Sequence, residues 1–174
     1  MANRDHMKIL KQGASVWNAW RAENIGITPE LYRADLNGLG FKLNINGLDL
    51  SGADLRRSDL SGSHVRNWCL DKANLFHADL RGAHIINSTL SHADLRSANL
   101  SNAVLSGSTL DHAIVYETTF AGLDLRNVQG LETIEHQGPS DVSVNTIYRS
   151  EGKIPEVFLR GCGVPDRGWR QNDD

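Results

Sequence analysis

Residues 73–100 read ANLFHADLRGAHIINSTLSHADLRSANL, and a large apolar residue recurs in them at every fifth position. The same period runs from Ile45 to Leu125, where all 17 such positions are Leu, Ile, Val or Phe and 12 of them are Leu. A small residue precedes most of these by two positions, and it is Ala in eight cases. Neither the helical period of 3.6 residues nor the strand period of two accounts for a strict period of five.

A chain that turns a corner every five residues does account for it. Each side then points one large and one small side chain inward, and four sides close a coil of about 20 residues. Successive coils stack at the spacing of β-strands, about 4.8 Å, so that Leu lies over Leu and Ala over Ala. Such an interior is filled by its own side chains and leaves no concave pocket for catalysis. We therefore expect function on the outward faces or at the two ends.

This pattern resembles the pentapeptide-repeat family, whose repeat is A-(D/N)-L-x-x. Five segments match it as they stand: Ala53-Asp54-Leu55, Ala73-Asn74-Leu75, Ala78-Asp79-Leu80, Ala93-Asp94-Leu95 and Ala98-Asn99-Leu100. The resemblance covers about residues 32–130 and implies an all-β solenoid, a right-handed quadrilateral β-helix. With it we expect an N-terminal helical cap at residues 1–30, the pentapeptide-repeat β-helix at 31–130, and a C-terminal cap or tail with short helices at 131–174.

The residue two positions after each inward Leu should form the corner. Two of the four corner columns contain only Gly and Asn, which tolerate positive φ. These columns are Gly47, Asn67, Asn87, Gly107 and Asn127, and Gly62, Gly82, Asn102 and Gly122. We expect type II-like turns there and less demanding turns in the other two columns, which include Arg57 and Lys72. The period slips once, because only four residues separate Phe41 from Ile45, so the first coil should be irregular.

A helix is predicted over residues 5–23, with Asp5 as its N-cap. An open end of a β-helix exposes strand-like backbone that would pair with other chains, so this helix is expected to cover it. The side chains predicted to form this cap are Met7, Leu10, Trp17 and Trp20.

The repeat stops after Asn127. Ser140 is expected to cap a short helix that runs through Arg149, and Pro155 to begin a second helix at Glu156–Arg160. The segments that flank the repeats resemble a bacterial subgroup in which a pentapeptide β-helix precedes a TIR domain; the matching stretches are Gln12-Gly13, Trp17 to Arg21 and Gly138 to Gly163. The chain ends at Asp174, so we expect no TIR domain and transfer no NAD-cleaving activity to it.

The charged residues are nearly balanced. Lys and Arg number 18 against 21 Asp and Glu, for a net charge of −3, which is not the strongly basic footprint of a nucleic-acid-binding surface. The N-terminus lacks the apolar segment of a signal peptide, and no apolar run approaches the roughly 18 residues of a membrane span. With only two cysteines, we expect a cytoplasmic protein that has no disulfide scaffold, no cofactor and no membrane association.

One outward column combines guanidinium and aromatic groups. It contains Arg56, Phe76, Arg96 and Tyr116, with Ile114 beside it. Guanidinium groups that alternate with rings can stack as a cation–π ladder. We take this column as the candidate interaction surface. The alternative is that the ladder only stabilises the β-helix locally.

Two pairs of histidines lie 20 residues apart, His64 with His84 and His92 with His112. Stacked coils would bring each pair close together. However, two imidazoles supply only half of a zinc site, so we assign no metal site.

Trp68 occupies a position that small residues fill elsewhere. We expect a local bulge that turns its ring outward and leaves Cys69 exposed. No base lies next to this cysteine in the sequence to activate it as a nucleophile. We assign no catalytic residue and do not expect an enzyme.

These features favour a non-enzymatic protein-interaction or scaffold module whose protein partner is unknown, and a homodimer is compatible with them. The alternative is a DNA-mimicking protein that binds DNA gyrase, because some pentapeptide-repeat proteins imitate duplex DNA and protect gyrase from quinolones. A mimic needs an extended field of one sign. Residues 41–127 contain nine acidic and eight basic residues, which weakens this alternative.

Overall fold

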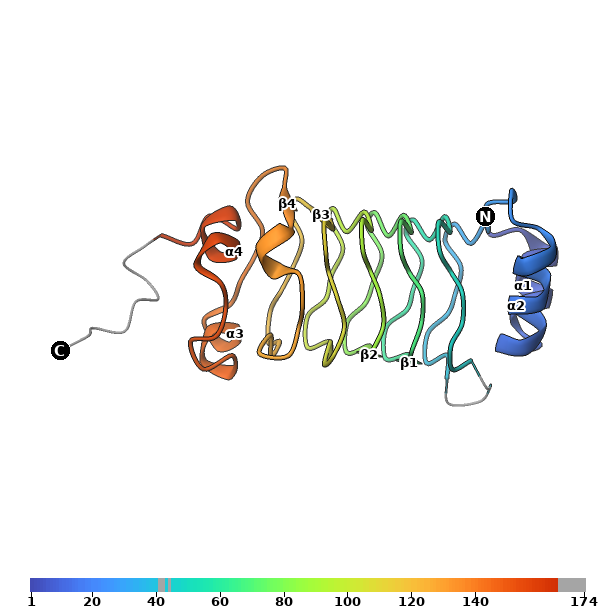
Figure 1. Ribbon diagram of the computed structural model, residues 1–174, viewed down its shortest axis with the longest axis horizontal. Helices are drawn as coiled ribbons and strands as arrows, with labels where there is room; N and C mark the ends of the chain where they lie inside the picture. The colour runs from blue at the N-terminus through green and yellow to red at the C-terminus, as the bar shows by residue number, and fades with distance from the viewer. Residues whose placement is uncertain (41–42, 44, 166–174) are drawn as a thin grey trace.

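The computed structural model describes residues 1–40, 43 and 45–165, which form a rod with helices at both ends (Figure 1). Its elements in chain order are α1 (Arg4–Leu10), α2 (Ala14–Glu23), β1 (His64–Arg66), β2 (His84–Ile86), β3 (Ile114–Val115), the 3-10 helix η1 (Leu131–Thr133), β4 (Glu135–His136), α3 (Val144–Arg149) and α4 (Glu156–Gly161). Among the described residues, no helix has the length and apolar character needed to cross a membrane.

Successive coils are joined by parallel backbone pairing with a step of 20 residues. In β1 and β2, Val65 lies opposite Ile85, and on another side Asp54, Asn74 and Asp94 pair in turn. Most pairs are isolated bridges between corners, because a side of five residues leaves little room for a regular strand. The expected all-β class therefore needs correction. The solenoid consists largely of turns, and helices cover its ends.

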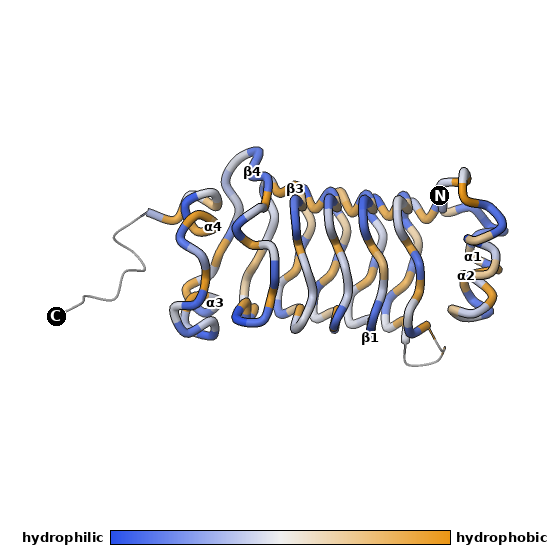
Figure 2. Tube along the Cα trace, in the orientation of Figure 1, coloured by the Kyte–Doolittle hydropathy of each residue, from blue (hydrophilic) through white to orange (hydrophobic). Residues whose placement is uncertain are grey.

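The interior matches the period of five. All 17 large apolar positions from Ile45 to Leu125 are buried, and so are the eight alanines two positions before them. In Figure 2 the apolar segments recur along each coil of the tube. Burial of this continuous apolar column is the main driving force for stacking the coils.

The corners differ from the prediction. Positive φ occurs in all four columns, and the non-glycine residues in the two columns predicted to be less demanding have φ between 51° and 59°. The column of Lys72 also forms hydrogen-bonded turns, in which the Ala73 amide donates to the Leu70 carbonyl at 3.0 Å. By contrast, the corner at Asn67 is wide, and there the Trp68 amide donates to Ser88 Oγ of the next coil at 3.1 Å. Asn127, which was expected to adopt positive φ, does not.

Trp68 points inward, so the predicted outward bulge is wrong. Its side chain is 1% exposed, and its indole N–H donates to the Ile45 carbonyl at 2.7 Å. The wide corner before it and the small Ser88 above it leave room for the ring. Cys69 is half-buried, with its thiol 3.6 Å from the Asp71 carboxylate.

The first coil is longer than the others. Glu30 pairs with Asp54 and Asp35 with Asp59, a step of 24 residues, whereas Asp49 pairs with Cys69 at the usual 20. The sequence slip was placed at Phe41, which lies outside the described residues. The extra length falls before Ile45, in agreement with an irregular first coil.

The N-terminal segment forms two helices rather than one over residues 5–23. Helix α1 is capped by Asn3, whose side-chain oxygen accepts from the amides of Asp5 and His6, so the expected Asp5 cap is wrong. The break comes at Gly13, which has φ of 100° and precedes α2. Glycine is a poor helix former and adopts this conformation without a steric penalty.

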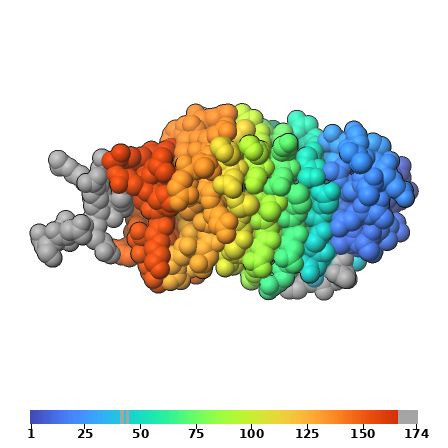
Figure 3. Space-filling view, viewed as in Figure 1, coloured from blue at the N-terminus to red at the C-terminus, as the bar shows by residue number. Residues whose placement is uncertain are grey.

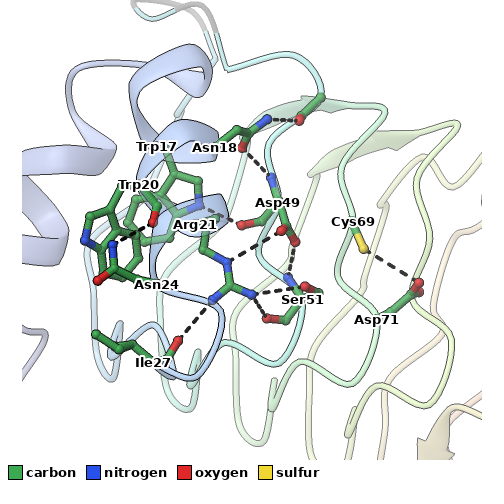
Figure 4. A network of polar contacts seen from close by, with 11 residues as sticks. Trp17, Asn18, Trp20, Arg21, Asn24, Ile27, Asp49, Ser51, Cys69 and Asp71 are labelled. Carbon is green, nitrogen blue, oxygen red and sulfur yellow. Dashed lines mark hydrogen bonds and ion pairs between the residues drawn. The ribbon is translucent and has the colours of Figure 1, made fainter.

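Helix α2 lies against the open edge of the first coils (Figure 4). The Trp17 indole N–H donates to the Asp49 carbonyl at 2.6 Å, and Asn18 both donates to the Gly47 carbonyl and accepts from the Asp49 amide. Arg21 donates to the Ser51 carbonyl at 2.9 Å. These side chains satisfy edge groups that would otherwise lack partners.

The four residues predicted to form the cap differ in burial. Leu10 and Trp17 are fully buried, whereas Met7 and Trp20 are partly buried and pack against the core. The ring of Trp20 lies between those of Trp17 and His6, with centroid distances of 5.1 and 4.8 Å.

At the other end the parallel ladder continues past residue 130. β3 pairs with β4, and Thr119 pairs with Asp141. Helix α3 starts later than expected, because Ser143 rather than Ser140 is its N-cap. Helix α4 follows Pro155 and extends through Gly161. Figure 3 shows both ends of the rod covered by these terminal segments.

Hydroxyl groups of α3 close the last coil. Thr146 Oγ1 donates to the Phe120 carbonyl at 2.6 Å and accepts from the Leu123 amide at 3.3 Å. Ser150 Oγ accepts from the Leu125 amide at 3.1 Å, and Arg149 donates to the Gly122 carbonyl. The side chains of a helix therefore take the place of a further coil.

Replacing Thr146 by Val tests this closure. The substitution keeps the shape of a side chain that is fully buried but leaves one carbonyl and one amide without a partner. We expect the free energy of unfolding to fall by about 3 kcal/mol, measured by urea denaturation. The matched control, Val144→Thr on the exposed face of the same helix, should change it by less than about 0.5 kcal/mol. Equal effects of the two substitutions would contradict the closure.

Candidate interaction surface

The predicted column lies on one face of the rod. Parallel pairing of Asp54 with Asn74, Asn74 with Asp94, and Asp94 with Ile114 places the residues two positions further on directly above one another. These residues are Arg56, Phe76, Arg96 and Tyr116. The structure therefore brings the four together in the expected order.

The stacking contacts are specific. The Arg96 guanidinium carbon lies 5.7 Å from the centre of the Phe76 ring, within the range of a cation–π contact. Arg56 makes the same contact with Tyr32, at 5.5 Å. The sequence reasoning missed Tyr32 because the longer first coil moves it to 24 residues before Arg56 instead of 20. Its position directly after an inward Leu was the signal that could have identified it.

Each arginine of the column is also bound to an aspartate. Arg56 donates from Nε and Nη2 to the two carboxylate oxygens of Asp54, and Arg96 does the same to Asp94, with closest contacts of 2.7 Å. These hydrogen bonds lower the pKa of Asp54. Burial opposes the shift most strongly at Asp94, yet the bonds from Arg96 outweigh it and that pKa is also lowered. Both guanidinium groups are thus held flat and largely neutralised.

The same Asp-x-Arg clamp occurs elsewhere on the rod. Asp79 binds Arg81 and Asp124 binds Arg126 with the same bidentate geometry, so four of the nine acidic residues in 41–127 are neutralised in this way. A clamped carboxylate contributes little to a long-range negative field.

Tyr116 forms the C-terminal part of the column and is 38% exposed. A hydrogen bond to Glu117 raises its phenol pKa. Gly138 packs against the ring so closely that a Cβ there would lie 2.6 Å from it. Between Phe76 and Tyr116 is an open depression of about 430 Å³, which is also lined by His77, Arg96, Ser97, Glu117 and Gln137.

Gln137 is a second residue that the sequence reasoning missed. It comes after the repeat has stopped, and its side-chain oxygen accepts from Arg96 Nη1 at 3.2 Å. Ile114 lies beside the column in β3 and is half-buried, so it contributes less exposed surface than Tyr116.

The histidine pairs stack as the coil length requires. The rings of His64 and His84 lie 4.4 Å apart, and those of His92 and His112 lie 5.1 Å apart. Burial and the neighbouring His84 and Arg66 lower the pKa of His64. Within the described part of the chain, no group of three or more His, Cys, Asp or Glu side chains is placed to hold a metal ion.

The cysteines offer no activated thiol. Cys162 is buried, and burial raises the pKa of its thiol to about 12, which makes the reactive thiolate scarce at neutral pH. Cys69 and Cys162 are both free of disulfide bonds.

Comparison with known proteins identifies the repeat. The family model for pentapeptide repeats matches eight copies, at residues 43–70, 73–111 and 98–129. No curated protein matches the chain.

Several solved structures are similar to the chain. A pentapeptide repeat protein from the thylakoid lumen of Arabidopsis thaliana is 24% identical over 63% of this chain and 74% of its own, with a TM-score of 0.49. HetL, involved in heterocyst differentiation regulation in the cyanobacterium Nostoc sp. strain PCC 7120, is 28% identical over 55% of this chain and 40% of its own, with a TM-score of 0.46. QnrB1, a plasmid-mediated fluoroquinolone resistance protein, is 26% identical over 47% of this chain and 44% of its own, with a TM-score of 0.26.

The matched repeats imply a right-handed β-helix, and they occupy the coils on which the aromatic and arginine column is built. Through these repeats, the chain belongs to the pentapeptide-repeat family.

Proposed function

We propose that the chain is a non-enzymatic interaction or scaffold module, a right-handed quadrilateral β-helix that binds a protein partner through the column of Arg56, Phe76, Arg96 and Tyr116. The observation that carries this proposal is the half-exposed stack of rings and clamped guanidinium groups beside an open depression. Aromatic and arginine side chains are the types that dominate binding energy in protein interfaces. Their fixed geometry lowers the conformational entropy lost on binding.

The local-stabilisation alternative explains part of the column but not all of it. Contacts such as Arg96 with Phe76 stabilise neighbouring coils. Yet Tyr116 keeps 38% of its surface exposed, and no arginine packs over its ring among the contacts of the described residues. A residue that served only to join coils would gain more from burial.

We further propose a cytoplasmic setting, in which the chain acts as a monomer or a homodimer. The resemblance of its flanking segments makes a TIR-type signalling protein one partner to test.

A double substitution, Phe76→Ala with Tyr116→Ala, tests the proposed surface. Removing both rings should eliminate the specific partner from affinity capture with the tagged protein, quantified by mass spectrometry of the source organism's lysate. The matched control is Val104→Ala, which truncates another exposed apolar residue on a different side of the rod. Capture of the same proteins at the same levels by wild type and double variant, with both folded by circular dichroism, would contradict the proposal.

DNA mimicry remains the second candidate, and the Asp-x-Arg clamps argue against it because they neutralise acidic side chains on the rod. We therefore expect no effect of the protein on supercoiling by DNA gyrase, and no protection of gyrase from a quinolone. Inhibition or protection at stoichiometric protein would favour the mimic and overturn the scaffold proposal.

A further inference from the structure

The aromatic members of the column recur at a fixed interval. Tyr32 lies opposite Arg56, Arg56 opposite Phe76, and so on to Tyr116, so that aromatic side chains occupy every second coil. Coils stack at about 4.8 Å, so Tyr32, Phe76 and Tyr116 form three ribs separated by roughly 9.6 Å. We call Tyr32, Phe76 and Tyr116 the ribs and Arg56 and Arg96 the floor.

The floor between the ribs is flat and nearly neutral. Arg56 and Arg96 each donate two hydrogen bonds to an aspartate, and Arg96 uses its remaining Nη1 on Gln137. Their donors are therefore largely used, so an anionic partner would find few left to bind. The guanidinium faces instead offer planar surfaces that stack on apolar groups.

Polar groups line the depression beside the ribs. Ser97 and Gln137 supply a hydroxyl and an amide, and Glu117 supplies a carboxylate on the same rim. Gln137 is exposed, so its amide N–H groups can reach the carbonyl of a bound chain. This combination of aromatic ribs and a few hydrogen-bond donors is the kind of surface that binds polyproline II segments.

The interval between ribs distinguishes among peptide conformations. A polyproline II helix repeats every three residues, or about 9.3 Å, which is close to the spacing of the ribs. An extended strand repeats side chains on one face at roughly 6.7 Å, and an α-helix has a pitch of about 5.4 Å. Neither of these repeats places equivalent side chains on successive ribs.

We propose that the column binds a proline-rich segment in the polyproline II conformation, lying along the rod axis with every third residue against a rib. This inference rests on the proposed function, because it names the class of partner for the same surface. Proline suits the site twice: its ring packs on aromatic faces, and its stiff backbone loses little entropy on binding. The Glu117 carboxylate favours a basic residue next to the proline run.

The test is an NMR titration of the labelled protein with acetylated, amidated nonaproline. We expect saturable chemical-shift changes confined to the column and its rim, including the signals of Phe76, Arg96, Tyr116 and Gln137. A Gly-Ser peptide of the same length is the control and should cause none. Tyr116→Ala should weaken binding of nonaproline by at least about tenfold through loss of one rib.

Tyr148→Ala is the matched control variant, because it removes a tyrosine that is 77% exposed on α3, outside the column. It should leave the affinity for nonaproline unchanged. Mapping on the wild-type protein keeps the test decisive if a rib variant is unstable. Absence of saturable shifts, or shifts located on α3 instead of the column, would overturn the inference. The interaction proposal would fail separately, by unchanged capture with Phe76→Ala and Tyr116→Ala.

Discussion

Each side of the rod ends at a residue whose backbone lies in the left-handed region, and most of these residues are not glycine. A non-glycine residue in that region costs about 1–2 kcal/mol, so a sequence with so many of them needs a compensating interaction. The same corner residues supply that interaction. The amides of Arg57, His77 and Ser97 each donate to a carbonyl of the next coil at 2.7–3.0 Å, while the Leu two positions earlier is buried. Stacking therefore fixes the corners, and the corners keep successive coils in register.

A stack held in this way must be closed at both ends, and the two ends use the same solution. Trp17, Asn18 and Arg21 reach from α2 to edge groups of the early coils, and Thr146 and Ser150 reach from α3 to those of the last coil. Because side chains replace backbone partners, each cap must fit its coil closely. The filled interior then leaves only the outer faces to meet other molecules, and stacking turns single residues on those faces into columns with a fixed spacing.

The sequence was sufficient to predict the coil, because a period of five with Leu and Ala in register fits neither a helix nor a flat strand. It also placed Phe76 and Arg96 in one column. It failed where the outcome depended on local competition between contacts. Lys72 and His92 take positive φ because inter-coil bonding outweighs their own preference, and Trp68 turns inward because Ser88 leaves it space. The sequence reasoning missed Tyr32 and Gln137 because both lie where the step departs from 20 residues.

Coil length gives the most direct test of the account. Duplication of residues 66–85 adds one full coil and returns every column and both caps to their partners, so the protein should fold with unchanged or higher melting temperature. Duplication of residues 66–70 alone preserves the period of five but rotates one cap by a side relative to the other parts of the rod. We expect that insertion to lower the melting temperature clearly. Equal melting temperatures for the two insertions would contradict a coil of four sides.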